Sequence, residues 1–352
     1  MQIAAHPARL LGLGTAVPAH ELPQDMVKIV ASRILGPRYP EFERLSKSFA
    51  NSGINKRYSV VPFEWFEAGK DWPERTAAYL EGATTLFVAA ANKALADASL
   101  RAEEIDTIVT ITSTGIATPT LEARAMASLA FRSDVMRVPV FGLGCAGGVT
   151  GLSIAARLAA ATPGSKVLLV CVETCTLSFR ADRMQKADII ATVLFGDGAA
   201  AACLSTESSS HPILGVGAEY TWPDTLPIMG WDVDTDGFGV IFDRSIPEFV
   251  KQNFADAVDG GLESMGLARD DLSRMICHPG GSKVVEAIEG ALHLEQGVLD
   301  SEREVLRDYG NMSAPTALFV LERVMARAPD GTMMLAALGP GFTASMLPIR
   351  FA

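Results

Sequence analysis

Cys145 is the side chain in this chain best placed to act as a nucleophile. It lies in the segment GLGCAGG at 142–148, between an apolar segment that predicts a strand at 138–141 and a segment that predicts a helix from near Ala146. The glycines permit a sharp turn, and a helix N-terminus directs partial positive charge and free N–H groups at the sulfur. Such a setting lowers the pKa of a thiol and supplies thiolate at neutral pH. The competing interpretation is a small apolar cysteine that fills a junction between strand and helix.

Two further side chains could act on a substrate beside this thiol. His278 ends a predicted buried strand and precedes the turn Pro-Gly-Gly at 279–281, a position where α/β proteins form ligand crevices. Asn311, in the segment YGNMSAP, could donate a hydrogen bond from its amide, or it could cap the following helix. A nucleophile, an imidazole and an amide donor fit acyl transfer, and a Cys-His-Asn hydrolase uses the same residue types.

An internal repeat indicates the scaffold that holds these residues. Segments of similar pattern align at one constant offset, which pairs Ser99 with Gly266, Val138 with Val305 and Gly164 with Gly331. The first and third pairs predict buried strands, and the second predicts a short strand, a turn and a helix in each copy. At this offset Cys145 falls on Met312, directly after Asn311. The pseudo-twofold therefore places Asn311 opposite the cysteine.

The repeat predicts an α/β protein made of two copies of one unit. One half covers 1–206 and carries the cysteine, and the other covers 212–352 and carries the histidine and the asparagine. A polar, turn-rich segment at 205–212 separates them. Continuous apolar strands that alternate with helices predict sheets covered by helices on both faces.

Composition excludes several classes of protein. The chain has 352 residues, of which 49% are hydrophobic, so it can bury a large core. A net charge of −11 opposes binding to nucleic acid, and no apolar run approaches the roughly 20 residues that span a bilayer. The five cysteines form no C-x-x-C pair, which argues against a disulfide framework and a zinc site. We expect a soluble, cytoplasmic protein without a membrane span or a bound metal.

Together these motifs resemble a known family. The segment around Cys145, HPGG at 278–281, GNMS at 310–313, FGDGAAA at 195–201 and GPG at 339–341 resemble the type III polyketide synthases, the chalcone synthase-like branch of the thiolase superfamily. The resemblance covers nearly the whole chain. A ketoacyl synthase III of fatty acid synthesis is the alternative, although it would be expected to show HQAN where this chain has HPGG.

The resemblance implies a duplicated thiolase-type fold with five αβαβα layers, a homodimer and an acyltransferase activity. In such an enzyme an acyl-CoA loads Cys145, malonyl-CoA loses CO₂, and a Claisen condensation extends the chain before it cyclises. The resemblance gives Cys145 the role of nucleophile, paired as a thiolate with a His278 imidazolium. His278 and Asn311 stabilise the enolate. The substrates are CoA thioesters, and no metal or redox cofactor is implied.

Several substrate-binding residues follow from the same resemblance. Lys56 and Arg57, in NKRY, are expected to bind the CoA phosphates, although two neighbouring cations are often only solvated surface charge. Thr118, Cys175 and Ser178 stand at positions that line or approach the substrate cavity in plant chalcone synthases.

Two further segments refine the expected substrate. Gly339, Pro340 and Gly341 belong to a family motif beside the substrate. The segment 220–240 resembles bacterial members that make alkylpyrones or alkylresorcinols. We therefore expect an aliphatic starter, for which small side chains at Cys175 and Ser178 leave room.

Overall fold

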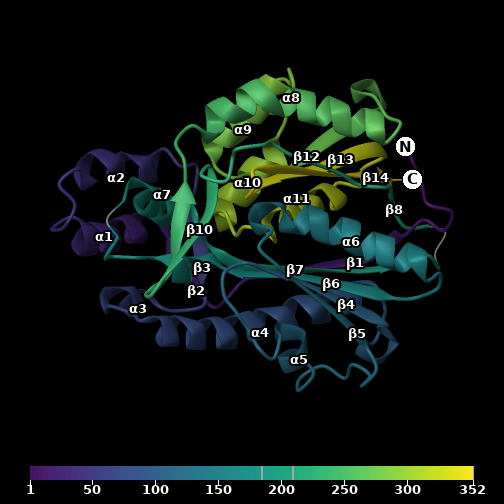
Figure 1. Ribbon diagram of the computed structural model, residues 1–352, viewed down its shortest axis with the longest axis horizontal. Helices are drawn as coiled ribbons and strands as arrows, with labels where there is room; N and C mark the ends of the chain where they lie inside the picture. The colour runs from purple at the N-terminus through teal and green to yellow at the C-terminus, as the bar shows by residue number, and fades with distance from the viewer. Residues whose placement is uncertain (184, 208–209, 352) are drawn as a thin grey trace.

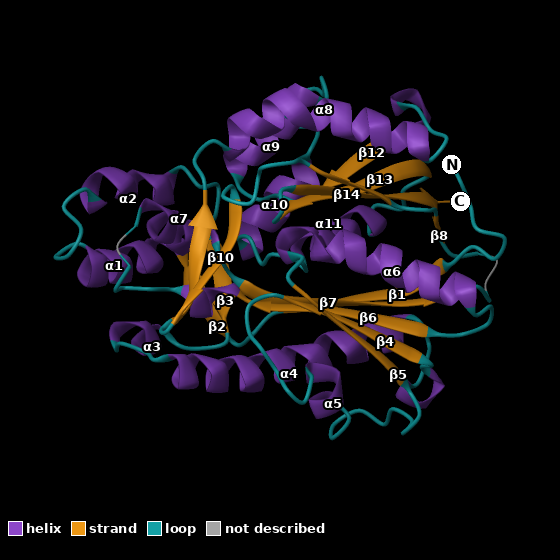
Figure 2. Ribbon diagram, viewed as in Figure 1, coloured by secondary structure: helices purple, strands orange, loops and turns teal. Residues whose placement is uncertain are grey.

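Five layers of secondary structure make up the molecule (Figure 1). The computed structural model describes residues 1–183, 185–207 and 210–351, so part of the predicted linker and the last residue of the second half lie outside the described residues. The two outer layers are helices, and each covers one sheet region (Figure 2). A central layer of two helices lies between the two sheet regions. The expected five-layered thiolase-type fold is confirmed.

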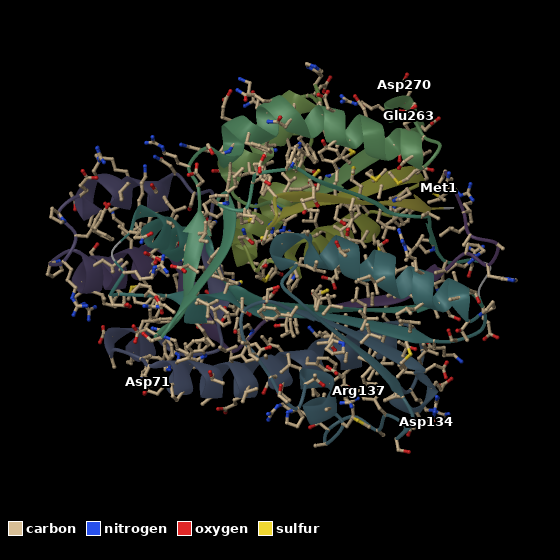
Figure 3. All side chains as sticks on the ribbon, viewed as in Figure 1. Met1, Asp71, Asp134, Arg137, Glu263 and Asp270 are labelled. Atoms are coloured by element: carbon tan, nitrogen blue, oxygen red, sulfur yellow. The ribbon has the colours of Figure 1, made fainter. Side chains whose placement is uncertain are left out.

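The first sheet region belongs to the N-terminal half. Its strands lie in the order β1 (Arg9–Ala16), β7 (Asp197–Ser205), β6 (Val167–Thr174), β4 (Thr107–Thr112) and β5 (Met136–Phe141). β4 is parallel to β5 and β6, whereas β7 is antiparallel to β1 and β6. The helices α4 (Trp72–Asp97) and α5 (Leu121–Ala125) cover its outer face (Figure 1). Asp71, labelled in Figure 3, caps α4 by accepting a 2.9 Å hydrogen bond from the backbone N–H of Glu74.

The second sheet region belongs to the C-terminal half. It contains β12 (Arg274–Cys277), β13 (Gly331–Gly339), β14 (Thr343–Phe351) and β9 (Ala218–Thr221). The helices α8 (Ile246–Ser264) and α9 (Ser282–Ala291) cover its outer face. The short strand β8 (Ile213–Leu214) pairs with both β14 and β1. The two regions are therefore joined into one ten-stranded sheet.

A further group of elements gathers at the end of the molecule where the central helix α6 (Gly147–Ala161) begins (Figure 1). They are α1 (Gln24–Leu35), α2 (Phe42–Ala50), α3 (Phe63–Glu67), α7 (Lys186–Leu194), α10 (Asp300–Tyr309), the paired strands β2 (His20–Pro23) and β3 (Lys56–Ser59), and the hairpin of β10 (Met229–Asp234) and β11 (Gly237–Phe242). Short 3₁₀ turns cover Ala102–Glu104, Gly144–Ala146, Cys175–Ser178 and Arg269–Asp271. This end holds the cavities described below.

One part of the predicted repeat is wrong. The strands expected after Ser99, Gly164, Gly266 and Gly331 are present as β4, β6, β12 and β13. The strand expected at Val305 is instead part of α10. Ser301, Glu302, Val305 and Leu306 are buried at the spacing of one helix face, and this period of 3.6 outweighs the match to the strand at Val138.

The central layer consists of α6 (Gly147–Ala161) and α11 (Thr316–Met325), packed between the two sheet regions. By length and composition alone, the stretch Gly144–Ala161 could also span a membrane, yet 67% of it is buried inside the fold. Packing on all sides therefore explains why it is apolar. Gly148 allows the close approach, because a Cβ at this position would collide with the carbonyl oxygen of Ala314, just before α11.

Gly148→Ala should destabilise the protein, since the added methyl group must push two packed helices apart. We expect a loss of about 1–3 kcal/mol in the free energy of unfolding, measured by urea denaturation. Gly260→Ala is the matched control, because Gly260 is exposed on α8 and its Cβ would meet nothing within 4 Å. That change should stabilise by about 0.5–1 kcal/mol. Equal effects of the two changes would contradict the proposed packing.

Candidate active site

Cys145 lies in the 3₁₀ turn Gly144–Ala146, between β5 and α6, and only 7% of its surface is exposed. The backbone N–H of Gly144 donates a 3.0 Å hydrogen bond to the Ser113 Oγ. Gly144 has a positive φ of 49°, and a Cβ there would lie 2.7 Å from the Pro340 Cδ. Glycine is therefore required for the turn that presents the thiol. The helix proper begins at Gly147, one residue after the predicted start.

His278 directly follows β12, as the sequence predicted. Its backbone N–H donates a 2.8 Å hydrogen bond to the Ala336 carbonyl of β13, which extends the sheet by one residue. The side chain is buried, and neither ring nitrogen has a hydrogen-bond partner among the described residues. An imidazole held in this way keeps both nitrogens available for a substrate.

Asn311 is held from both sides by the backbone of the other half. Its N–H donates to the Leu194 carbonyl at 2.8 Å, and its carbonyl accepts from the Gly196 N–H at 3.0 Å. The side-chain Oδ1 accepts from the Ser313 N–H at 2.8 Å, and Nδ2 donates to the Gly280 carbonyl at 3.2 Å. Asn311 therefore does not cap α11. Its amide orientation is fixed, and one Nδ2 hydrogen remains for a ligand.

The structure brings Cys145, His278 and Asn311 together at one enclosed space, which we call the catalytic chamber. The Cys145 Sγ lies 3.9 Å from the Asn311 Oδ1. Apart from these three, the chamber is lined by Gly144, Cys175, Phe195, Met229, Gly230, Trp231, Val240, Ile241, Phe242, Ile246, Gly280, Val284, Ser313, Leu338, Pro340 and Phe342. Most of these side chains are apolar, so the chamber excludes water around the reacting groups.

Burial acts on the protonation of both Cys145 and His278. Desolvation raises the pKa of Cys145 to about 11, although hydrogen bonds with Ser313 and Asn311 act in the opposite direction. Burial also lowers the pKa of His278 to about 3. Burial therefore favours a thiol and a neutral imidazole over the expected thiolate and imidazolium. A neutral imidazole can accept the thiol proton during attack.

A second, mostly apolar space extends from the chamber, and we call it the apolar cavity. It lies among α1, α3, α7 and the turn Cys175–Ser178, and its lining consists of Leu22, Val27, Val30, Ala31, Ile34, Arg57, Phe63, Phe66, Cys175, Thr176, Ser178, Phe179, Asp188, Ala191, Thr192 and Phe195. Its cavity volume is about 60 Å³, so the space is narrow. Cys175 and Phe195 line both spaces, so they form the boundary between them.

A third space leads from the chamber to the surface, and we call it the cationic mouth. Phe242, Gly280 and Val284 line both spaces. The mouth lies among α2, α7, α9 and the end of β11, and it contains four exposed cations, Lys47, Lys186, Arg244 and Lys283. None of the four forms a salt bridge with a described residue. Their charge is therefore available to an anionic ligand.

The structure places Lys56 and Arg57 outside the lining of the cationic mouth. Lys56 and Arg57 are neighbours on β3, where successive side chains point to opposite faces. Lys56 forms a 2.7 Å ion pair with Glu21, away from the mouth. Arg57 is only 1% exposed and lines the apolar cavity. Arg57 is therefore too deeply buried to meet a phosphate at the surface, whereas Lys56 remains partly exposed.

The other predicted substrate-binding residues divide into two groups. Cys175 and Ser178 line the apolar cavity, and Pro340 lines the chamber. Gly339 and Gly341 line none of these spaces. Gly339 instead lets the end of β13 lie against the turn that carries Cys145, since a Cβ added at this position would lie 2.7 Å from the Leu143 carbonyl oxygen. Thr118 is exposed and also lies outside these spaces within the single chain.

A buried carboxyl group that sequence reasoning missed supports the nucleophile turn. Glu173, at the end of β6, accepts hydrogen bonds from the Ser113 N–H at 2.9 Å and the Thr114 Oγ at 2.7 Å. Ser113 in turn accepts from the N–H of Gly144, next to the nucleophile. Desolvation raises the pKa of Glu173 from its usual value near 4.5 to about 8. Glu173 is therefore a positioning residue that is mostly protonated at neutral pH.

Comparison with known proteins agrees with this arrangement. Residues 1–208 match the model of the N-terminal domain of chalcone and stilbene synthases, and residues 216–350 match that of the C-terminal domain. The chain is 36% identical to a 1,3,6,8-tetrahydroxynaphthalene synthase of Streptomyces peucetius, with 96% of this chain and 91% of that protein covered. It is 33% identical to a putative chalcone synthase of Bacillus subtilis, with 97% and 98% covered.

Solved structures show the same similarity in three dimensions. PKS-I from the brown alga Ectocarpus siliculosus superposes with a TM-score of 0.92 at 26% identity, and each chain is covered completely. The 1,3,6,8-tetrahydroxynaphthalene synthase of Streptomyces coelicolor also superposes with a TM-score of 0.92 at 26% identity, with 97% of this chain and 99% of that chain covered. The architecture is therefore shared over the full length.

The raised pKa of Glu173 predicts a pH dependence of stability. Between about pH 4.5 and 8 the folded protein keeps a proton that the unfolded chain has released, so Glu173 lowers stability as pH rises through this window. Glu173→Gln should remove this decline, and thermal unfolding from pH 5 to 8 measures it. Glu263→Gln, at the surface of α8 (Figure 3), is the control and should leave the profile of the unchanged protein intact. A profile that stays unchanged in Glu173→Gln would contradict this role.

Proposed function

Because the chain belongs to the chalcone and stilbene synthase family and is a type III polyketide synthase, an acyltransferase, we propose that it extends an aliphatic acyl chain with malonyl units. The product we propose is an alkylpyrone or an alkylresorcinol. The observation that carries this proposal is the apolar cavity, which opens from the chamber at Cys175 and Phe195 and suits a flexible hydrocarbon chain. The ketoacyl synthase III alternative gains no support from the family match.

In the first proposed step, an acyl-CoA delivers its acyl group to Cys145. The thiol attacks the thioester carbonyl while the neutral imidazole of His278 accepts the thiol proton. The tetrahedral intermediate then collapses, the bond to the CoA sulfur breaks, and that sulfur takes the proton from His278. The acyl tail extends past Cys175 into the apolar cavity.

In the second proposed step, malonyl-CoA enters and loses CO₂. The electron pair of the broken carbon–carbon bond moves into an enolate, whose oxygen accepts hydrogen bonds from His278 and from the free Nδ2 hydrogen of Asn311. Donors fixed in place before charge develops supply the largest catalytic effect in reactions of this kind. The enolate carbon then attacks the acyl group and the Cys145 thiolate leaves. The departure of CO₂ drives the step, so we propose no metal or redox cofactor.

The cationic mouth is the proposed site for the CoA phosphates. Lys47, Lys186, Arg244 and Lys283 surround the opening through which a pantetheine arm can reach the chamber. The whole chain carries a net charge of −11, so this group of unpaired cations stands out from the rest of the surface. Cations at an entrance also attract anionic substrates over distances of about a Debye length.

A homodimer is also proposed, and β5 marks its interface. β5 is the edge strand of the sheet, and its Met136 and Phe141 are exposed apolar side chains, as is Ile116 in the preceding loop. An exposed apolar edge is a surface that a second copy can cover. Thr118 lies two residues beyond Ile116, so in a dimer it would approach the partner rather than its own chamber.

Replacing the catalytic residues should separate the two steps. Cys145→Ala should abolish the starter adduct that intact-protein mass spectrometry detects. Asn311→Ala should still load a decanoyl group on Cys145 but release CO₂ from malonyl-CoA about 10²- to 10³-fold more slowly, because one donor to the enolate is lost. An adduct on Cys175 or Cys277 in Cys145→Ala, or normal CO₂ release by Asn311→Ala, would refute the roles.

The apolar cavity predicts a dependence on starter length. Each methylene buried contributes about 0.8 kcal/mol, so the apparent affinity should rise several-fold for every two carbons until the cavity is filled. Competition between acetyl-, hexanoyl-, decanoyl- and coumaroyl-CoA measures this. Ser178→Phe should shift the preference to shorter chains, whereas Thr85→Phe, exposed on α4, should not. A preference for acetyl- or coumaroyl-CoA that Ser178→Phe leaves unaltered would rule out the aliphatic starter.

The proposed location of the CoA site at the cationic mouth can be tested by charge reversal. Lys283→Glu should raise the KM for acyl-CoA several-fold, and added salt should reduce the difference, because exposed charges are screened. Lys56→Glu is the control, because Lys56 pairs with Glu21 and does not line the mouth. This change should alter the KM little. If Lys56→Glu had the larger effect, the assignment from the sequence would be right and the mouth wrong.

A further inference from the structure

Arg57 carries an unused hydrogen-bonding edge at the wall of the apolar cavity. The side chain is 1% exposed, and its Nη1 donates a 3.1 Å hydrogen bond to the Phe195 carbonyl. Nε and Nη2 have no acceptor among the described residues. These two N–H groups lie side by side on one edge of the guanidinium plane, which is the edge that binds two oxygens at once.

The nearest carboxylate does not occupy this edge. Asp197 attracts Arg57 electrostatically, but its oxygens accept hydrogen bonds from the Thr176 N–H at 2.8 Å, the Thr176 Oγ at 2.7 Å and the Val60 N–H at 2.8 Å. Burial lowers the pKa of Arg57 to about 9, which leaves the group charged at neutral pH. A buried cation with free donors is costly unless an acceptor meets it.

The position of Arg57 beside the apolar cavity indicates which ligand could accept its free hydrogen bonds. Arg57 binds the carbonyl of Phe195, and the Phe195 side chain forms the boundary between the catalytic chamber and the apolar cavity. The Thr176 and Thr192 hydroxyls of the cavity wall donate hydrogen bonds within the fold, to Asp197 and to the Asp188 carbonyl. The Asp188 side chain also lines the cavity, and its Oδ1 has no hydrogen-bond partner among the described residues. Because Arg57 lines the cavity that opens at Phe195, a chain anchored at Cys145 that enters this cavity comes close to the Arg57 side chain.

We propose that Arg57 binds the paired oxygens of a 1,3-dicarbonyl segment in the growing polyketide chain. The inference rests on the proposed function, because two or more extensions are needed to place two ketone oxygens in a 1,3 relation. Each condensation moves the existing ketone oxygens two carbons farther from Cys145, so they reach the edge only after a set number of extensions. Holding them there restrains the chain before ring closure. Arg57 is thus a residue that determines how many units are added.

The test uses protection of Cys145 against iodoacetamide by small probes. Nonane-2,4-dione presents two oxygens and nonan-2-one presents one on a chain of the same length. We expect the dione to protect the unchanged protein at a concentration about tenfold lower, since hydrogen bonds to a charged donor are stronger than neutral ones. Arg57→Lys keeps the charge but lacks the paired donors, and it should abolish the preference.

Arg75→Lys is the matched control. Arg75 also donates to backbone carbonyls, those of Leu177 and Phe179, but it does not line the apolar cavity. It should retain the preference for the dione. Equal protection by the two probes in the unchanged protein would overturn the inference, because the edge would then bind only water. This comparison decides the matter even if Arg57→Lys fails to fold.

Product analysis separates this inference from the proposed function. With decanoyl-CoA and malonyl-CoA, Arg57→Lys should give products with fewer malonyl units, while the unchanged protein gives cyclised products. If the unchanged protein loads decanoyl groups and releases CO₂ but shows no dione preference, only the role of Arg57 fails. If the unchanged protein loads no acyl group, the proposed function fails as well.

Discussion

The pair of hydrogen bonds between Asn311 and the backbone of Leu194 and Gly196 joins the two halves at the active site, and the other functional features depend on it. The bridge demands glycine on both sides. A Cβ at Gly310 would lie 2.7 Å from the Leu194 carbonyl oxygen, and one at Gly196 would lie 2.6 Å from the Tyr309 carbonyl oxygen. The bridge places Asn311 beside the thiol and sets Phe195 at the boundary of the chamber. The motifs FGDG and YGN thus have one physical explanation.

Burial is the second condition that shapes this site. Burial in a chamber of mostly apolar side chains, which excludes water, disfavours charge on both the thiol and the imidazole. The same absence of water strengthens the hydrogen bonds that His278 and Asn311 offer to an enolate. It also raises the cost of leaving the donors of Arg57 without an acceptor. One environment therefore favours both the condensation chemistry and a site for the oxygens that the chemistry creates.

Sequence reasoning identified the residues that carry local signals. Glycine-rich turns and strand ends, which act over a few neighbouring residues, singled out Cys145 and His278. Apolar strands that alternate with helices predicted sheets covered by helices on both faces, and the family resemblance implied the five layers. Arg57 was misplaced because NKRY shows two adjacent cations, whereas strand geometry sends one outward and the other into the core. The apolar cavity could not be predicted, since its lining comes from α1, α3, α7 and a distant turn. In the sequence, Glu173 is only a polar residue at the end of an apolar strand. Its role depends on contacts with the loop that follows β4, where the Ser113 N–H donates to it.

The path of the acyl chain is the central claim, and a crystal structure of the protein after reaction with decanoyl-CoA, without malonyl-CoA, tests it most directly. The account predicts continuous density from the Cys145 Sγ past Cys175 and Phe195 into the apolar cavity between α1 and α7. Density for the chain in the cationic mouth, or an acyl group on any other cysteine, would contradict it.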